Sequence, residues 1–474
     1  VVQAARERPD EDAQRRFERT YGAIKVQQPT VAMEYMHEGD DPAKAQVHTS
    51  TERYDTLSSE IGTRSVEKLD FGAVAAAAKA WLGIFTEEHE EIEGMDGGKF
   101  DLQKEISFDL FVRTLYAMPR GKAVGQSGFS VEMLTAFKKH GPEQRAMYDS
   151  IMGDLRAARV PPSWRVVVYA LLVKPPPCNP NVVCERREIA IMEQMMKLTL
   201  QMARAVSYSR AAGRVHRAQQ GWLKGMMTAD VGVLLDVVAQ QTARLGEGEL
   251  WILFIDLKSF FPSMPRLILR MVEDAHGVPR EVLDLAAAIY CGAEAEGAGG
   301  ASCRYDSAAG LGGYFDNWMG SMMGCVLSTD KAKLFINCVI SAIDMLTVGV
   351  ELWGTAPTTA GAAWDRVKHG AFADDWFGVS RSKEQVLRAW DIWRAFCKIF
   401  GSQLGVKRRM KTGVTGVRYV DGKATEVEDP GLEMEGGGTV PFWVHTEAYK
   451  HLGIWKRADG VGAHGWADVK KRLT

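Results

Sequence analysis

Apolar and polar positions follow two patterns along the chain, which predict a mixture of helices and strands. In the longer segments, apolar residues recur every three or four positions, as in helices that bury one face. Predicted helices cover 66–85, 106–118, 130–137, 192–207, 228–243, 267–272, 280–289, 329–346 and 383–400. Short, nearly continuous apolar runs are typical of strands. Predicted strands cover 166–173, 250–263, 417–420 and 449–455.

Two adjacent acids, Asp374 and Asp375, stand between apolar runs and follow His369 and Gly370. Neighbouring residues of a strand point to opposite faces, so both carboxylates reach one spot only if a tight turn lies at or beside them. A β-hairpin with carboxylates at its tip is one such arrangement. Burying adjacent acids is costly unless a cation neutralises them, and hard oxygen ligands favour Mg²⁺ or Mn²⁺. An exposed acidic turn is the alternative, and it is the commoner case for an isolated Asp-Asp pair.

A third acid, Asp256, interrupts the apolar strand predicted over 250–263. An acid in such a strand must be paired or bound to a metal. One Asp on a strand and a carboxylate hairpin together can hold two divalent metals about 3.5–4 Å apart, which clamp the attacking and leaving oxygens of a phosphoryl transfer. This chemistry requires acids from two distant strands to meet on one sheet.

Glycine-rich and basic segments add candidate phosphate contacts. Glycines interrupt segments 120–129 and 320–328, each just before a predicted helix, where backbone N–H groups can face a substrate. Lys174 and Arg187 flank one loop and could both face a polyanion, although a surface salt bridge is the more common role for either one alone. Segment 404–412, which includes Lys411, is strongly basic.

Composition limits the classes of protein to consider. The 474 residues are 46% hydrophobic and 25% charged, which is ordinary for a soluble globular protein of two to four domains. We expect no signal peptide and no membrane span, because the most apolar segments are too short. The seven cysteines form no Cys-x-x-Cys pair, which argues against a zinc knuckle and a disulfide framework. We therefore expect an intracellular protein, in the nucleus or cytoplasm.

The net charge of −2 conceals an uneven distribution. Residues 1–100 contain 12 Lys and Arg against 20 Asp and Glu, and the remaining chain contains 46 against 40. Weak overall basicity argues against a nucleic-acid partner, although a local basic groove would be enough to bind one.

Taken in order, these segments resemble the motifs of reverse transcriptases, most closely those of non-long-terminal-repeat (LINE-type) retrotransposons. The resemblance covers residues 105–474. Segment 254–261 matches the first catalytic motif, and 372–375 matches the Y/F-x-D-D signature. Six further segments resemble other motifs of the family. In the first half of the chain, 122–128 resembles K-A-P-G-P-D-G, 164–174 with 187–189 resembles a strand ending in Lys followed by R-P-I, and 220–222 resembles Q-x-G-F. Further along, 320–328 resembles G-x-x-Q-G-x-x-x-S, 405–411 a Lys-bearing motif and 450–454 the primer grip. Each motif is weak alone, but seven or more in order are strong support.

The resemblance implies an α+β, right-hand polymerase fold with fingers and palm, in which helices back an antiparallel palm sheet. It places an acidic, partly helical extension at 1–104, the fingers with part of the palm at 105–248, the palm at 249–456 and the start of the thumb at 457–474. Most of the thumb is then missing. Because no endonuclease domain and no Cys/His knuckle is recognisable and the first residue is Val1 instead of Met, we expect a core fragment of a larger polyprotein.

The implied activity is that of an RNA-directed DNA polymerase, which extends a primer with dNTPs on an RNA template. Its partners are then an RNA template, a DNA primer, their hybrid and dNTPs. Two Mg²⁺ or Mn²⁺ ions are expected on Asp256 and Asp374, with Asp375 in support.

Further roles are carried over from the family motifs. Phe261, five residues after Asp256, occupies the steric-gate position that excludes a ribose 2′-hydroxyl. The remaining roles are triphosphate binding by Lys174 and Arg187, protonation of the departing pyrophosphate by Lys411, contact with template and base by Met323 and Gly324, and primer grip by Leu452 and Gly453.

Several residues depart from the family pattern. Met323 stands where the family usually has Gln, and a thioether cannot donate the hydrogen bond that an amide can. Other departures are Val124, Ser127, Glu188 and Thr329, and Pro262 is closer to retron and group II intron enzymes. A degenerate, non-catalytic domain that binds RNA as a scaffold is therefore an alternative. An RNA-dependent RNA polymerase is less favoured, because that class typically has a polar residue at the gate.

Overall fold

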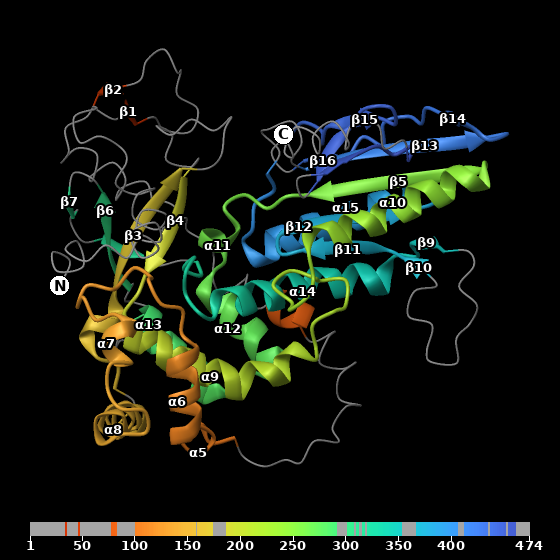
Figure 1. The fold of residues 1–474 in the computed structure, drawn as a ribbon. Coiled ribbons are helices and arrows are strands. Elements are labelled where there is room, and N and C mark those ends of the chain that lie inside the picture. Colours follow the sequence, from red (N-terminus) through yellow and green to blue (C-terminus); the bar gives the residue numbers. More distant parts are fainter. Residues whose placement is uncertain are drawn as a thin grey trace, which may run out of the picture. The chain divides into compact units, whose positions relative to one another are not determined.

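The computed structural model describes two compact units of the chain (Figure 1). Unit 1 consists of Val1–Lys68, Glu91–Gly213 and Glu273–Ser328, and unit 2 of Leu69–Glu90, Arg214–Val272 and Thr329–Thr474. The described residues are 34–35, 46–47, 77–82, 100–157, 159–173, 186–291, 301–307, 310–311, 315–317, 320–352, 366–405, 412–434, 437–451 and 454–460. Both units combine helices with strands, which confirms the α+β class.

Each unit is assembled from separate stretches of the chain. The chain leaves unit 1 after Gly213, returns at Glu273 and leaves again after Ser328. The linear boundaries expected at residues 104, 248 and 456 stay predictions. The assignment of the parts to fingers and palm stays a prediction.

The helices of unit 1 follow the apolar periodicity only in part. The helix predicted over 106–118 is confirmed as α6 (Phe108–Ala117), which begins after Ser107 because the Ser107 hydroxyl accepts a hydrogen bond from the Leu110 N–H as an N-cap. The helix predicted over 130–137 is a single turn. The helices are α5 (Leu102–Glu105), α6 (Phe108–Ala117), α7 (Val131–Leu134), α8 (Pro142–Arg156), α9 (Gln194–Ala212) and α13 (Arg280–Cys291).

The larger sheet of unit 1 is mixed. Its strand order is β4-β3-β6-β7, with β8 also paired to β6, and only the β3–β6 pair is parallel. The strands are β3 (Val166–Val173), β4 (Arg186–Ile191), β6 (Ala301–Ser307), β7 (Gly310–Leu311) and β8 (Phe315–Asn317). β3 has the predicted bounds and follows the short 3₁₀-helix η5 (Pro162–Arg165). A separate pair joins β1 (Glu34–Tyr35) to β2 (Gln46–Val47).

The larger sheet of unit 2 has the order β11-β12-β5-β13-β14, in which every pair is antiparallel. Its strands are β5 (Gly248–Ile255), β11 (His369–Phe372), β12 (Asp375–Ser380), β13 (Gly413–Val420) and β14 (Lys423–Thr425), and β15 (Phe442–Val444) joins β13 in parallel. Two small antiparallel pairs are β9 (Val350–Glu351) with β10 (Arg366–Val367), and β16 (Tyr449–His451) with β17 (Ile454–Lys456). The single strand predicted over 449–455 is therefore wrong, since this segment forms two strands.

Helices cover both faces of this sheet (Figure 1). On one face, Leu250, Ile252 and Phe254 of β5 form a core with α10 (Thr228–Leu245). Side chains alternate along a strand, and on the other face Trp376 lies edge-on to Trp393 of α15 (Lys383–Phe400), with ring centroids 5.4 Å apart. The other helices of the unit are α11 (Phe260–Ser263), α12 (Arg266–Ala275), in which the boundary to unit 1 falls, and α14 (Ser328–Leu346).

The local signals at helix ends explain why α15 has the predicted bounds. The Ser382 hydroxyl accepts a hydrogen bond from the Gln385 N–H, and Gly401 ends the helix in the left-handed conformation.

The helix predicted over 66–85 is described only at 77–82, which is helical. Within the described residues, no helix is long and apolar enough to cross a membrane.

Candidate functional site

The acidic pair lies at the tip of a β-hairpin, as its sequence predicts. β11 and β12 pair from His369 opposite Gly378 to Phe372 opposite Asp375. The two residues between the strands, Ala373 and Asp374, form the turn. Asp374 and Asp375 are both half-buried, which disfavours the alternative of a fully exposed acidic turn.

The sheet register brings Asp256 to the same place. Ile255 at the end of β5 pairs with Trp376, so the next positions along the two strands are Asp256 and Asp375. Directly opposed residues of antiparallel strands share a face, with β-carbons about 4.5–5.5 Å apart, and like charges in this arrangement destabilise the sheet. A divalent cation would relieve this repulsion. The register thus places Asp256 beside Asp375, with Asp374 in the adjoining turn, and these three acids are named the carboxylate site.

Neighbouring segments fix the backbone of Asp256. The Thr412 hydroxyl accepts a hydrogen bond from the Asp256 N–H and donates one to its carbonyl oxygen, both at 3.2 Å. The Gly405 N–H donates to the same carbonyl at 2.8 Å. A β-carbon on Gly405 would lie 2.4 Å from Oδ2 of Asp256, so only glycine leaves room for the carboxylate in this position.

A buried tyrosine borders the carboxylate site. The Tyr449 ring stacks on Phe254 with centroids 4.0 Å apart. Burial, together with the negative charges of Asp256 and Asp375, raises the pKa of the Tyr449 phenol. The phenol therefore stays protonated at neutral pH and adds no negative charge beside the carboxylates.

Phe261, the candidate steric gate, lies in the same unit as the carboxylate site. It belongs to α11, the helical turn that follows the end of β5 and Asp256. The Phe261 ring is half-buried and meets the Trp222 ring edge-on, with centroids 5.8 Å apart and an interplanar angle of 72°. Trp222 therefore restricts the directions in which the Phe261 ring can move.

The remaining described candidates belong to unit 1. Arg187 is exposed on β4. On the same strand, the Ala190 N–H donates a hydrogen bond to the Met323 carbonyl at 2.5 Å. Gly324 has a φ of +107°, and a β-carbon there would lie 2.4 Å from the Ala190 carbonyl oxygen. The structure thus brings the Met323–Gly324 loop against the strand that carries Arg187.

Four candidates lie outside the described residues. They are Lys174, Lys411, Leu452 and Gly453. Their assigned roles stay predictions.

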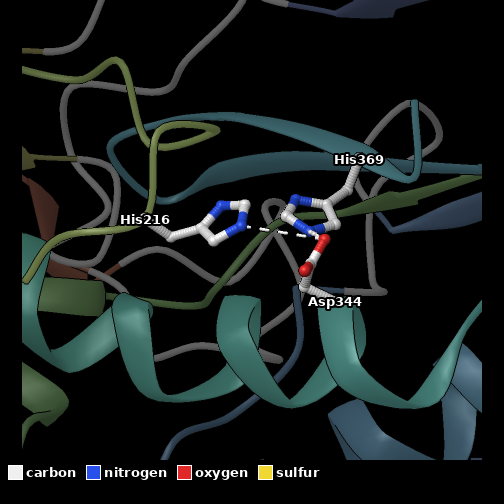
Figure 2. A group of neighbouring side chains, drawn as sticks. All are labelled: His216, Asp344 and His369. Carbon is white, nitrogen blue, oxygen red and sulfur yellow. Dashed lines mark ion pairs between the residues drawn. The ribbon is translucent and has the colours of Figure 1, made fainter. Parts of the chain in front are cut away.

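A second group of potential ligands lies elsewhere in unit 2, where His216, Asp344 and His369 offer ligand atoms within 4.8 Å of one another. Figure 2 shows both imidazole rings directed at the carboxylate of Asp344, which belongs to α14. The Nε2 atoms of His216 and His369 lie 3.7 and 3.8 Å from its Oδ1. Sequence reasoning did not find this group, because its members are far apart in the chain.

Hydrogen bonds and a lysine indicate that this group is an ion-pair network and not a metal centre. The His216 Nδ1 accepts a hydrogen bond from the Ala218 N–H at 3.2 Å, which leaves the proton of a neutral ring on the Nε2 that faces Asp344. Lys368 Nζ lies 3.5 Å from the same carboxylate oxygen. A metal ion bound there would have to displace Lys368 from Asp344.

Burial controls the protonation of this network. Burial lowers the pKa of His369 to about 3, and the nearby His216, Lys368 and Arg217 lower it too, against the opposing charge of Asp344. The hydrogen bond from His216, with the charges of His216, Lys368 and His369, lowers the pKa of Asp344 to about 2. His369 is therefore neutral and Asp344 ionised at neutral pH.

Sequence reasoning missed the residues that support the carboxylate site: Gln219, Gly405, Thr412 and Tyr449. Each lies in or beside a segment that carries a family motif. Only the three-dimensional contacts show that Gln219 bonds the main chain of Ala373, whereas Gly405 and Thr412 bond that of Asp256.

The chain matches no protein-family model, and no curated protein matches it. The chemistry of the site is therefore the guide to function.

We expect Gly405→Ala to weaken Mn²⁺ binding at the carboxylate site, because the new methyl group displaces the Asp256 carboxylate. The loss should be about 10–100-fold, as when other supports of a metal ligand are removed. Mn²⁺ titration followed by electron paramagnetic resonance measures it. Gly153→Ala is the control, because that position on α8 has open space and helical alanine is favoured. Equal Mn²⁺ affinity in both variants would contradict the packing argument.

The network at His369 predicts a loss of stability in mild acid. The unfolded chain binds a proton at this histidine below pH about 6.5, whereas the folded protein does so only near pH 3. Stability is therefore highest above pH 6.5 and falls by roughly 2 kcal/mol as pH drops to 4.5. The depressed pKa of Asp344 adds a loss only below about pH 4.

Urea unfolding at pH 7 and pH 4.5 measures this difference in free energy. We expect His369→Phe to reduce the pH-dependent loss, and the exposed-site control His140→Asn to keep it. An unchanged loss in His369→Phe would assign the acid sensitivity to other groups.

Proposed function

We propose that the chain is an RNA-directed DNA polymerase, which extends a primer with dNTPs on an RNA template. The observation that carries this proposal is the register of β5 and β12, which opposes Asp256 to Asp375 beside the turn that holds Asp374. The register aligns acids from two distant parts of the chain at one end of an antiparallel sheet, which supports a site for metal-dependent nucleotidyl transfer.

The donor set fits divalent cations such as Mg²⁺ or Mn²⁺. Carboxylate oxygens are the ligands that these hard ions prefer, and Gly405 leaves space at Oδ2 of Asp256. In the proposal, Asp256 and Asp374 hold two ions and Asp375 supports the cluster. Bound ions would neutralise the carboxylates and stabilise negative charge on the reacting phosphate.

The reaction is displacement of pyrophosphate from the α-phosphate of a dNTP by the 3′-hydroxyl of a primer. The proposal assigns the triphosphate charges to Lys174 and Arg187, and proton donation to the departing pyrophosphate to Lys411. The exposed position of Arg187 on β4 is compatible with its role. Met323 and Gly324 would contact the base and template, and Leu452 and Gly453 the primer.

Phe261 would select deoxyribonucleotides. A bulky ring at this position excludes a 2′-hydroxyl by contact, and Trp222 limits how far the ring can retreat. The proposed fold is the right-hand polymerase fold, in which the sheet of unit 2 is the palm. Its helix-covered antiparallel arrangement supports this assignment.

We expect Asp256→Asn and Asp374→Asn each to lower Mg²⁺-dependent dNTP incorporation on a primed RNA template by at least about 10²–10³-fold. The amide keeps the shape of the side chain but removes the charge that holds a cation. Asp421→Asn is the matched control, because Asp421 lies exposed in the turn between β13 and β14.

Primer extension with the purified chain measures these rates. Full activity of either variant would reject the metal assignment. If the unsubstituted chain binds RNA but incorporates no nucleotide, the scaffold alternative replaces the polymerase. Incorporation of NTPs in preference to dNTPs would instead indicate an RNA polymerase.

We expect Phe261→Ala to reduce discrimination against ribonucleotides by about 10–200-fold, the usual range for one lost packing contact in a specificity pocket. The ratio of kcat/KM for a dNTP to that for the matching NTP measures the change. Phe137→Ala removes a 44% exposed ring in unit 1 and should leave the ratio unchanged. An unaltered ratio in Phe261→Ala would disprove the gate.

A further inference from the structure

A buried glutamine holds the turn that carries the acids. Gln219 is fully buried, and its amide makes two hydrogen bonds to the main chain of Ala373. Its Nε2 donates to the Ala373 carbonyl at 2.9 Å, and its Oε1 accepts from the Ala373 N–H at 2.9 Å. One side chain thus fixes the peptide groups on both sides of the residue that precedes Asp374.

The backbone at Ala373 needs such support. Its φ is +62°, in the left-handed region that non-glycine residues rarely occupy. This conformation turns the chain between β11 and β12 and sets the directions of Asp374 and Asp375. The hydrogen bonds of Gln219 therefore act on the torsion angles that aim the two carboxylates.

The segment that carries Gln219 is itself docked against β11. The Ala371 N–H donates to the Ala218 carbonyl at 2.9 Å, and the Gln220 N–H donates to the Ala371 carbonyl at 2.8 Å. These bonds form an isolated parallel bridge between the segment and β11 at the edge of the hairpin. The position of the glutamine is thus set by backbone pairing and does not depend on its side chain alone.

Gly221 completes the arrangement. Its N–H donates to Oε1 of Gln219 at 2.9 Å, so this oxygen accepts from two N–H groups. If the Gln219 amide were rotated by 180°, its NH₂ group would face the N–H groups of Gly221 and Ala373, which are also donors. The amide orientation is therefore fixed. A β-carbon on Gly221 would lie 2.2 Å from the Ala373 nitrogen, so the close approach requires glycine here.

We infer that Gln219 is a positioning residue, which holds the Ala373 turn so that Asp374 and Asp375 join Asp256 in binding divalent cations. This inference rests on the proposed function for its catalytic consequence, whereas its structural part concerns the turn alone. Gln219 contacts no reacting atom in this scheme.

The primary variant is Gln219→Met, which keeps the length of the side chain but neither donates nor accepts these hydrogen bonds. We expect Mn²⁺ affinity, measured by electron paramagnetic resonance, to fall at least about tenfold, the lower end for losing a support of a metal ligand. kcat for dNTP incorporation should fall by a similar factor, with little change in the KM for dNTP. Amide hydrogen exchange in 369–378 should accelerate.

The matched control is Gln144→Met. Gln144 is also fully buried, but it lies in unit 1, where it donates to the Tyr116 hydroxyl and accepts from the His140 N–H. It loses equivalent hydrogen bonds, so a general loss of stability would affect both variants alike. We expect it to leave Mn²⁺ affinity, kcat and exchange in 369–378 unchanged.

Two further variants test the mechanism if Gln219→Met folds poorly. Gly221→Ala should produce the same changes while keeping the glutamine, because the methyl group pushes the segment away from Ala373. Gln219→Glu can both accept and donate only when its carboxyl group is protonated. Its activity relative to the unsubstituted chain should therefore rise as pH falls, which a purely structural defect would not produce.

The outcomes separate this inference from the proposed function. If Gln219→Met matches Gln144→Met in exchange and in Mn²⁺ affinity, Gln219 does not position the turn. If the unsubstituted chain incorporates no dNTP and its Mn²⁺ binding is insensitive to Asp374→Asn, the polymerase proposal fails. Even if the polymerase proposal fails, faster amide exchange confined to 369–378 in Gln219→Met would support the inference that Gln219 holds the Ala373 turn.

Discussion

The antiparallel register of β5 and β12 is the constraint on which the arrangement of unit 2 depends. The antiparallel register puts Asp256 and Asp375 on one face of the sheet, at the end of both strands, with Asp374 in the adjoining turn. Like charges in this position destabilise a sheet. The sheet tolerates them because helices pack on both of its faces and fix the register through cores that include Phe254 and Trp376.

The residues around the acids act mainly on the backbone. Thr412 and Gly405 hold the main chain of Asp256, and Gln219 holds that of Ala373. Tyr449 borders the cluster as a neutral group, since its raised pKa keeps the phenol protonated. These neutral groups thus fix the backbone from which the carboxylates project.

Local signals in the sequence were enough to predict single elements. β3 has its predicted bounds because a continuous apolar run defines the strand. α15 has its predicted bounds because apolar residues recur at helical spacing between two capping residues. The hairpin tip at Asp374 and Asp375 was also predictable, since adjacent acids share a site only at a turn. Helices α5 and α8 were not predicted, and the Ser107 cap makes α6 begin two residues after the predicted start at 106.

Contacts between distant segments could not be predicted in the same way. The register of β5 and β12 depends on how the whole sheet packs, and a shift of one residue would move Asp256 to the other face. The hydrogen bonds of Gln219 to Ala373 join residues far apart in the chain, and no local pattern encodes them. The same holds for the network of His216, Asp344 and His369, which three separate segments contribute.

The central claim is that the three acids form one binding site for divalent cations. Anomalous diffraction from crystals of the chain grown with Mn²⁺ tests it most directly, because the anomalous signal locates the ion. The account predicts Mn²⁺ bound between the carboxylates of Asp256 and Asp374. Crystals in which Mn²⁺ binds elsewhere, while basic side chains neutralise these carboxylates, would contradict it.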